Sequence, residues 1–111
     1  MCGRFALYAT ADTIKKAVNA LWVPEGTPRY NIAPSQDVLV LIHTPDGRRG
    51  ELMQWGLVPF FAPDKHLSPP LINARAESVH EKPSFRRALQ ARRCLVPMSG
   101  FFEWQRTEVK Q

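Results

Sequence analysis

The sequence has few cysteines and no long apolar run, and each shortage excludes a class of protein. Its 111 residues include two cysteines, Cys2 and Cys94, so at most one disulfide can form and a disulfide-stapled scaffold is excluded. The longest apolar run is Val38–Ile42, far short of the ~20 residues that a membrane-spanning helix needs. The first residues lack a basic segment followed by an apolar one, so we expect no secretory signal. These absences favour a reducing cytoplasmic location, at the nucleoid in a bacterium, without a membrane partner.

The remaining composition is that of a globular domain with a surplus of positive charge. Hydrophobic residues make up 44% and charged residues 23%, so we expect residues 1–111 to form a single domain. Fifteen lysines and arginines against ten acidic residues give a net charge of +5. Such a surplus suits a polyanionic partner, above all nucleic acid. It is equally typical of small soluble proteins that bind no nucleic acid, so charge alone leaves both interpretations open.

Two segments have the spacing of short helices. Apolar residues at helical intervals predict a helix of about three turns that is capped by Thr10 and ended by Pro24 and Gly26. Pro83 suits the first turn of a second helix, which we expect to run to about Arg92.

Strands outnumber these helices. Apolar or alternating runs predict strands over Gly3–Tyr8, Val38–Ile42, Leu52–Val58, Leu71–Ala74, Cys94–Met98 and Gly100–Trp104. Turn-forming residues predict loops over Val23–Pro34 and Pro59–Pro70, and a tight turn at Thr44–Gly47. Because the strands do not alternate regularly with helices, we expect an α+β fold with a mostly antiparallel sheet and about two short helices.

Cys2 has a specific chemistry open to it. A small second residue favours removal of Met1, which would leave a cysteine whose α-amine and thiol share one Cα. The amine titrates at about 7.7–8.0 and the thiol at about 8.5, so some neutral amine and some thiolate exist at neutral pH. Such an aminothiol condenses with an aldehyde to a thiazolidine, or acts as an N-terminal nucleophile with its own amine as base. Taken alone, Cys2 is more often a small buried hydrophobe.

Four other polar residues suit a site around this cysteine. Arg4 shares the strand face of Cys2, where its charge would lower the thiol pKa or hold a phosphate. Asn73 ends an apolar run, so its amide caps the next turn or points into a site, and Arg75 shares its face. Glu103 lies between aromatic residues, where an inward carboxyl would be desolvated and have a raised pKa; on the opposite strand phase it is solvated. Each of the four also has an ordinary structural role open to it.

Arginines and aromatic residues suit nucleic acid, and no metal or cofactor motif accompanies them. Arg86 and Arg93 share one helix face, which either contacts a phosphate backbone or is simply solvated. Four aromatic residues could stack on bases, although aromatic residues more commonly fill a core: Trp55, Phe60, Phe61 and Trp104. The cysteines and histidines show no metal-ligand spacing, and glycine-rich phosphate loops and GxSxG motifs are absent, so we predict no metal and no cofactor.

Five motifs in a fixed order make a specific resemblance. They are MCGRF at the N-terminus, RYNIAP at Arg29–Pro34, WGLVP at Trp55–Pro59, INARAE at Ile72–Glu77 and GFFEW at Gly100–Trp104. Over nearly the whole chain they resemble the SOS response-associated peptidase (SRAP) family, whose members shield abasic sites in single-stranded DNA. The resemblance implies a lyase- or peptidase-like protein of the DNA damage response. In such a protein, autocatalytic or aminopeptidase removal of Met1 would expose Cys2. Cys2 would then form a thiazolidine crosslink with the aldehyde of the opened abasic sugar.

The resemblance also implies roles for residues that match the family motifs. Asn73 would position Cys2, and Glu103 would exchange the proton in sugar-ring opening and in crosslink reversal. Arg4 and Arg75 would hold DNA phosphates. At the DNA-binding surface we further expect Asn31 and Pro34 of the RYNIAP segment, with Phe61 and Arg86.

This chain departs from the family pattern at two points. Members usually carry a tryptophan in the loop after WGLxP, where this chain has Phe60 and Phe61, although phenylalanine also stacks on bases. Family domains are longer and carry a His-x-Arg-Met-Pro motif beyond the position of Glu103, which is absent here. We therefore expect the N-terminal portion of an SRAP domain, C-terminally incomplete, which self-associates through exposed sheet edges.

Two other functions stay open on the sequence. A non-covalent module for single-stranded DNA would use the same basic and aromatic residues, and would bind in a salt-dependent way without a denaturant-resistant product. An N-terminal cysteine peptidase would use Cys2 on peptides, as the family name suggests. A mature chain that still carries Met1 would contradict both covalent capture and the peptidase.

Overall fold

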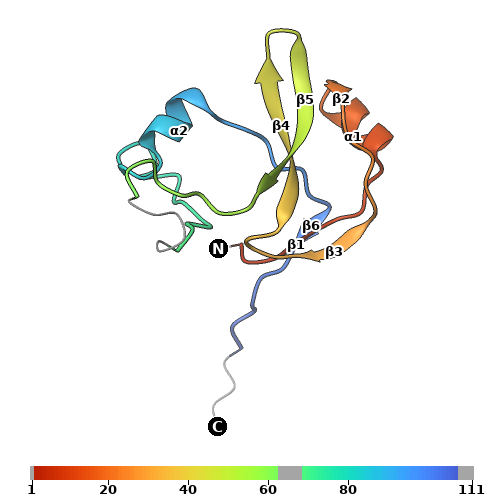
Figure 1. The fold of residues 1–111 in the computed structure, drawn as a ribbon. Coiled ribbons are helices and arrows are strands. Elements are labelled where there is room, and N and C mark those ends of the chain that lie inside the picture. The colour runs from red at the N-terminus through yellow and green to blue at the C-terminus, as the bar shows by residue number, and fades with distance from the viewer. Residues whose placement is uncertain (1, 63–68, 108–111) are drawn as a thin grey trace.

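The computed structural model describes residues 2–62 and 69–107, whose strands form two three-stranded sheets (Figure 1). The first sheet has the order β3-β1-β6 and is antiparallel, with β1 at Phe5–Leu7, β3 at Arg29–Ile32 and β6 at Gly100–Phe101. The second has the order β2-β5-β4, with β2 at Ala20–Trp22, β4 at Asp37–Thr44 and β5 at Gly47–Gln54. Strands β4 and β5 are antiparallel, and β2 joins β5 in parallel. With helices α1 at Ala11–Ala17 and α2 at Arg86–Ala91, the expected α+β fold is confirmed.

Strand β4 carries the centre of the core because its β-branched and leucine side chains are covered from both sides. Val38 and Val40 pack against Phe5 and Ile32, which lie in the other sheet. Leu41 lies on the opposite face of β4, where it packs with Ile14 of α1, Ala20 of β2 and Val23. The tight turn predicted between β4 and β5 is confirmed, and Gly47 adopts φ = 137° where the hairpin reverses.

Helix α1 begins where the sequence predicts and ends earlier. The Thr10 hydroxyl accepts a hydrogen bond from the Thr13 N–H at 3.1 Å, which is the expected N-cap. Asn19 then adopts a left-handed φ of 52°, and the chain turns into β2. Leu21, which precedes Pro24 and was therefore predicted to be helical, lies in this strand and is 54% exposed. The prediction that the helix continues to Pro24 was therefore wrong.

Three further predicted boundaries were wrong, those of two strands and one helix. For the strands the reason is that strand pairing, rather than local composition, decides where short strands form. The predicted loop Val23–Pro34 contains β3, whose pairing with β1 overrides its proline-rich flanks. The return strand predicted at Leu52–Val58 begins and ends earlier, as β5. The second helix begins at Arg86 rather than at Pro83.

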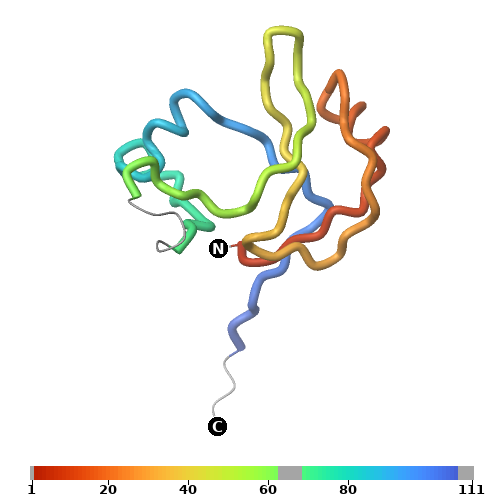
Figure 2. The backbone as a smooth tube through the Cα atoms, in the orientation of Figure 1, coloured from red at the N-terminus to blue at the C-terminus, as the bar shows by residue number. Residues whose placement is uncertain are grey.

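The segment after β5 leaves both sheets and returns to β4 (Figure 2). The predicted strands Leu71–Ala74 and Cys94–Met98 each reduce to a single bridge, Leu71 with Leu57 and Leu95 with Leu41. Leu71 is 36% exposed, so this run is not the buried strand that was predicted. The last predicted strand, Gly100–Trp104, is shorter in the structure, where β6 ends at Phe101.

The predicted loop Pro59–Pro70 includes residues 63–68, which lie outside the described residues. Across the parts of the chain that are described, no helix is long and apolar enough to cross a bilayer.

Candidate functional site around Cys2

Cys2 and Asn73 are 71 residues apart in the sequence and meet in the fold. The Asn73 side-chain amide donates a hydrogen bond to the Cys2 carbonyl oxygen at 2.8 Å. Both side chains are half-buried, and the Cys2 thiol lies 3.5 Å from the Arg4 carbonyl oxygen, within reach of a weak S–H hydrogen bond. The Asn73 amide therefore fixes the main chain of Cys2 instead of capping the turn that follows it.

Trp55 aligns the segment that carries Asn73. Its indole N–H donates to the Ile72 carbonyl oxygen at 3.1 Å, and its ring packs against Phe5 with centroids 5.4 Å apart. Leu57 and Leu71 exchange two backbone hydrogen bonds, at 2.8 and 2.9 Å. Because these three bonds are consecutive along the segment, the position of Asn73 is set by residues that directly follow β5.

Gly56 explains why this segment can come so close. It has φ = 137°, a conformation that side chains rarely adopt, and a Cβ built there would lie 2.6 Å from the Pro70 Cβ. Only glycine fits both conditions. Sequence reasoning used the WGLVP motif for recognition but missed the geometric task of Trp55 and Gly56, for which the isolated glycine after a strand was the available signal.

Cys2 and Asn73 line a largely apolar cleft of about 1040 Å³. The valines of β4 form one wall, and residues around α2, among them Phe85 and Ala88, form another. A molecule in this cleft would contact both polar and apolar groups.

Arg4 is exposed just before β1 and is oriented by Asn31 of β3. The Arg4 guanidinium donates to the Asn31 side-chain oxygen at 3.0 Å. Since one of its nitrogens is held in this way, the remaining N–H donors of the guanidinium face solvent in a defined direction. Two of the sequence-predicted DNA-binding residues are therefore in contact with each other. Pro34, half-buried, follows β3 by two residues.

Glu103 lies in the segment that continues β6 alongside the N-terminal residues. The Phe102 N–H donates to the Arg4 carbonyl oxygen at 3.0 Å, which extends the pairing of β1 and β6 toward Cys2. The Glu103 side chain is exposed.

The other predicted residues have different described neighbours. Arg75 is exposed at the start of a turn in which its carbonyl oxygen accepts from the Val79 N–H at 2.9 Å. Phe61 is 54% exposed and packs edge-on against Phe60, with ring centroids 5.3 Å apart. Arg86 is exposed at the first position of α2. Sequence reasoning gave no role to Arg87, although its guanidinium lies 4.2 Å above the Phe60 ring.

The two cysteines differ in their surroundings. Cys94 lies at the surface, yet nearby protein atoms partly desolvate its thiolate, and this raises the pKa of the Cys94 thiol above its ordinary value. Neither cysteine forms a disulfide. Within residues 2–62 and 69–107, no group of three or more His, Cys, Asp or Glu side chains is placed to hold a metal ion.

Comparison with known proteins assigns the family. The sequence profile of the family described as SOS response associated peptidase (SRAP) matches residues 1–111. The chain is 43% identical over 113 residues to the abasic site processing protein YoqW of Bacillus subtilis, covering 99% of this chain and 50% of that protein. It is 33% identical over 114 residues to YedK of Escherichia coli, covering 96% and 49%, and 30% identical over 132 residues to HMCES of Rattus norvegicus, covering 97% and 37%; both carry the same description. The chain thus spans half or less of the length of these relatives, and it belongs to the SRAP family.

Proposed function

We propose that this chain captures abasic sites in single-stranded DNA by a covalent bond to Cys2. The observation that carries the proposal is the hydrogen bond from Asn73 to the Cys2 carbonyl oxygen, since it immobilises the residue whose amine and thiol would react. The SRAP relatives that are described as abasic site processing proteins support the same substrate class.

The chemistry needs two bonds from Cys2 to one carbon. After removal of Met1, the neutral α-amine adds to the aldehyde carbon of the opened abasic sugar, and the adduct loses water to give an imine. The thiolate then adds to the imine carbon, the nitrogen takes up a proton, and a five-membered thiazolidine results. One C–N and one C–S bond form, one water is released, and no oxidant or reductant is required.

Neighbouring residues would supply what this reaction demands besides the nucleophile. Asn73 holds the main chain of Cys2, so that the amine does not have to be ordered when the sugar arrives. Arg4, oriented by Asn31, is available for a DNA phosphate next to the reacting sugar. Glu103 would exchange the proton of the sugar ring oxygen during opening and reversal.

DNA contacts are expected on the remaining basic and aromatic residues. Arg75 and Arg86 are exposed and would contact phosphates, whereas Phe61 would stack on a base. Pro34 would border the strand beside Asn31.

Intact-protein mass spectrometry tests this proposal directly. We expect the isolated protein to lack Met1. After incubation with a single-stranded oligonucleotide that has one abasic site, we expect its mass to rise by that of the oligonucleotide less one water. The Cys2→Ala variant should give no adduct, whereas Cys94→Ala should give the full amount, because it removes the other cysteine and leaves the cluster intact.

Two outcomes would overturn covalent capture. One is an adduct that survives in Cys2→Ala, which would assign the reaction to another nucleophile. The other is a wild-type chain that has lost Met1 and still forms no adduct. If that chain binds the oligonucleotide reversibly and in a salt-dependent manner, the non-covalent module is the correct function.

A further inference from the structure

We propose that Tyr8 and Tyr30 form a base-stacking platform for single-stranded DNA, on the same sheet face as Arg4. The inference rests on the proposed function insofar as it takes DNA as the ligand. It adds Tyr8, which lies outside the five motifs, and a role for Tyr30, which lies in RYNIAP but has no assigned role above.

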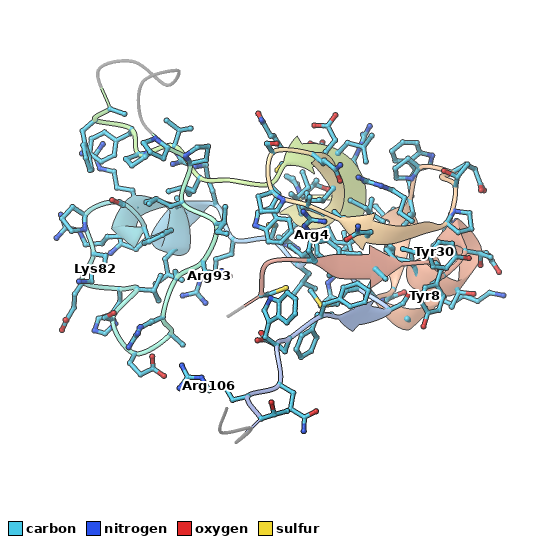
Figure 3. All side chains as sticks on the ribbon, turned by 90° about the horizontal axis from the view of Figure 1, so that it is seen from below. Arg4, Tyr8, Tyr30, Lys82, Arg93 and Arg106 are labelled. Atoms are coloured by element: carbon cyan, nitrogen blue, oxygen red, sulfur yellow. The ribbon has the colours of Figure 1, made fainter. Side chains whose placement is uncertain are left out.

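The two tyrosine rings lie against each other at the protein surface. Their centroids are 5.7 Å apart and their planes differ by 22°, which is a stacked arrangement. Tyr8 is 53% and Tyr30 64% exposed, so the pair is not part of the core. Each ring therefore keeps exposed aromatic surface that a further flat ring can cover, and Figure 3 shows the two side by side beyond Arg4.

A β-bulge brings both rings and the Arg4 contact to one face. Phe5 is paired with Ile32 and Leu7 with Arg29, so two residues of β3 stand opposite the single residue Ala6. These two residues are Tyr30 and Asn31. A bulge of this kind re-aims side chains and occurs next to functional sites.

The consequence is a double row of side chains across the two strands. Arg4 and Tyr8 lie on the same side of β1, because residues at even spacing share a face of a strand. Asn31 reaches Arg4, with a hydrogen bond of 3.0 Å, and Tyr30 reaches Tyr8. A guanidinium and an aromatic pair thereby lie on one face, on residues whose Cα atoms are about 13 Å apart from four residues of strand rise.

The platform is held rigidly on the β6 side as well. The Tyr8 N–H donates to the Ser99 hydroxyl oxygen at 3.0 Å, and the Ser99 N–H donates to the Ala6 carbonyl oxygen at 2.7 Å. Because β1 is bonded to a neighbour on each side, Tyr8 is ordered before any ligand binds. Little further conformational entropy is lost on binding.

The chemistry of this row favours a single-stranded polynucleotide. An aromatic surface stacks on any base, and a guanidinium binds phosphate. Together these groups suit a nucleic acid strand whose bases are exposed, and not a base-paired duplex. An acidic peptide would pair with Arg4 but offers no flat rings in regular succession. The net charge of +5 favours the same polyanion.

Binding of an undamaged oligonucleotide isolates this site from the covalent step. We would measure fluorescence anisotropy of a labelled single strand without an abasic site, using the full chain. The Tyr8→Leu/Tyr30→Leu double variant removes the rings but keeps apolar bulk, and we expect its affinity to fall roughly 5- to 150-fold for one stacked base. The matched control is Tyr8→Phe/Tyr30→Phe, which keeps both rings and should bind within about twofold of wild type.

A second measurement locates the contact. These are the only two tyrosines of the chain, so photocrosslinking to a 5-iodouracil oligonucleotide should give modified peptides that contain Tyr8 or Tyr30. Equal affinity of the Leu and wild-type proteins, with no modified tyrosine, would overturn the platform. The same is true if wild type does not bind single strands at all. A chain that shows the tyrosine dependence but never forms an adduct would retain the platform and lose covalent capture, so the two proposals fail separately.

Discussion

Replacement of Gly56 by alanine should disturb the site around Cys2 through a clash with Pro70. The new Cβ would lie 2.6 Å from the Pro70 Cβ, whereas carbon atoms prefer about 3.5–4.0 Å, so Pro70 has to move by about 1 Å. The φ of 137° adds strain of about 1–3 kcal/mol for a non-glycine residue. The displaced residue directly precedes the Leu71 bridge.

The displacement should reach Asn73 through bonds that are consecutive in the chain. Leu71 is bonded to Leu57, Ile72 to the Trp55 indole, and Asn73 to Cys2, so a shift at Pro70 enters this series at its first member. Misplacement of a reacting group by about 1 Å costs up to roughly 100-fold in rate. We therefore expect the strain to make Gly56→Ala less stable than wild type by at least about 1 kcal/mol. We also expect it to form the DNA adduct roughly ten to a hundred times more slowly.

Gly26→Ala is the matched control, because a Cβ at Gly26 meets nothing within 4 Å and its φ lies outside the strained range. Urea unfolding followed by tryptophan fluorescence gives the stability, and timed mass spectra give the adduct rate. Hydrogen exchange of the Leu57 and Leu71 amides reports the bridge independently of any DNA chemistry. If Gly56→Ala matches Gly26→Ala in stability and in amide protection, the close approach at Pro70 does not hold this segment and the reasoning is refuted.

Three other substitutions or conditions give further tests. Asn73→Leu removes one hydrogen bond, with a net value of about 0.5–1.5 kcal/mol, so the adduct rate should fall roughly 2- to 13-fold in timed mass spectra while Met1 removal continues. Ile32→Ala empties the most deeply buried position, at 1% exposure, and should cost about 2–5 kcal/mol in urea unfolding; Leu52→Ala, at 62% exposure, should cost less than about 1 kcal/mol, and equal losses would contradict the core described above. Burial raises the pKa of the Cys94 thiol, so the folded state holds this proton more tightly than the unfolded state: the resulting stability is complete below the ordinary value of 9.0 and is lost as pH rises through the folded pKa. Iodoacetamide should accordingly modify Cys94 more slowly in the folded chain than in urea at the same pH, and Cys94→Ala should remove this alkaline loss of stability.

The elements that sequence reasoning located well are those with strong local signals. Thr10 caps α1 because a threonine before an amphipathic segment satisfies a free N–H, and β4 follows from an unbroken run of β-branched and leucine residues. Strand β3 was missed because it has only four residues between prolines. Its formation depends on hydrogen bonds to β1, more than twenty positions earlier, which no local pattern encodes.

The candidate site shows the same division between local and distant information. Motif order pointed to Cys2 and Asn73 together, but nothing in their local sequence indicated that an amide would bond a carbonyl 71 residues away. The alternation that links Arg4 to Tyr8 was readable in the sequence. The stacking of Tyr30 on Tyr8 could not be predicted from the sequence, because a bulge changes the register by one residue without a distinctive composition.

Strand β1 unites the two proposals because both depend on its position between β3 and β6. It begins directly after Arg4 and three positions after Cys2, and Tyr8 comes just after its end. A strand bonded on both sides moves as part of its sheet, so groups arranged along it keep their spacing more precisely than groups on separate loops. A single DNA strand that stacks on the tyrosine pair and places a phosphate at Arg4 would therefore reach Cys2 in a fixed register. Deletion of Asn31 would leave Tyr30 alone opposite Ala6 and would remove the hydrogen-bond partner of Arg4, so the tyrosine pair should persist while the Arg4 guanidinium is no longer oriented beside it.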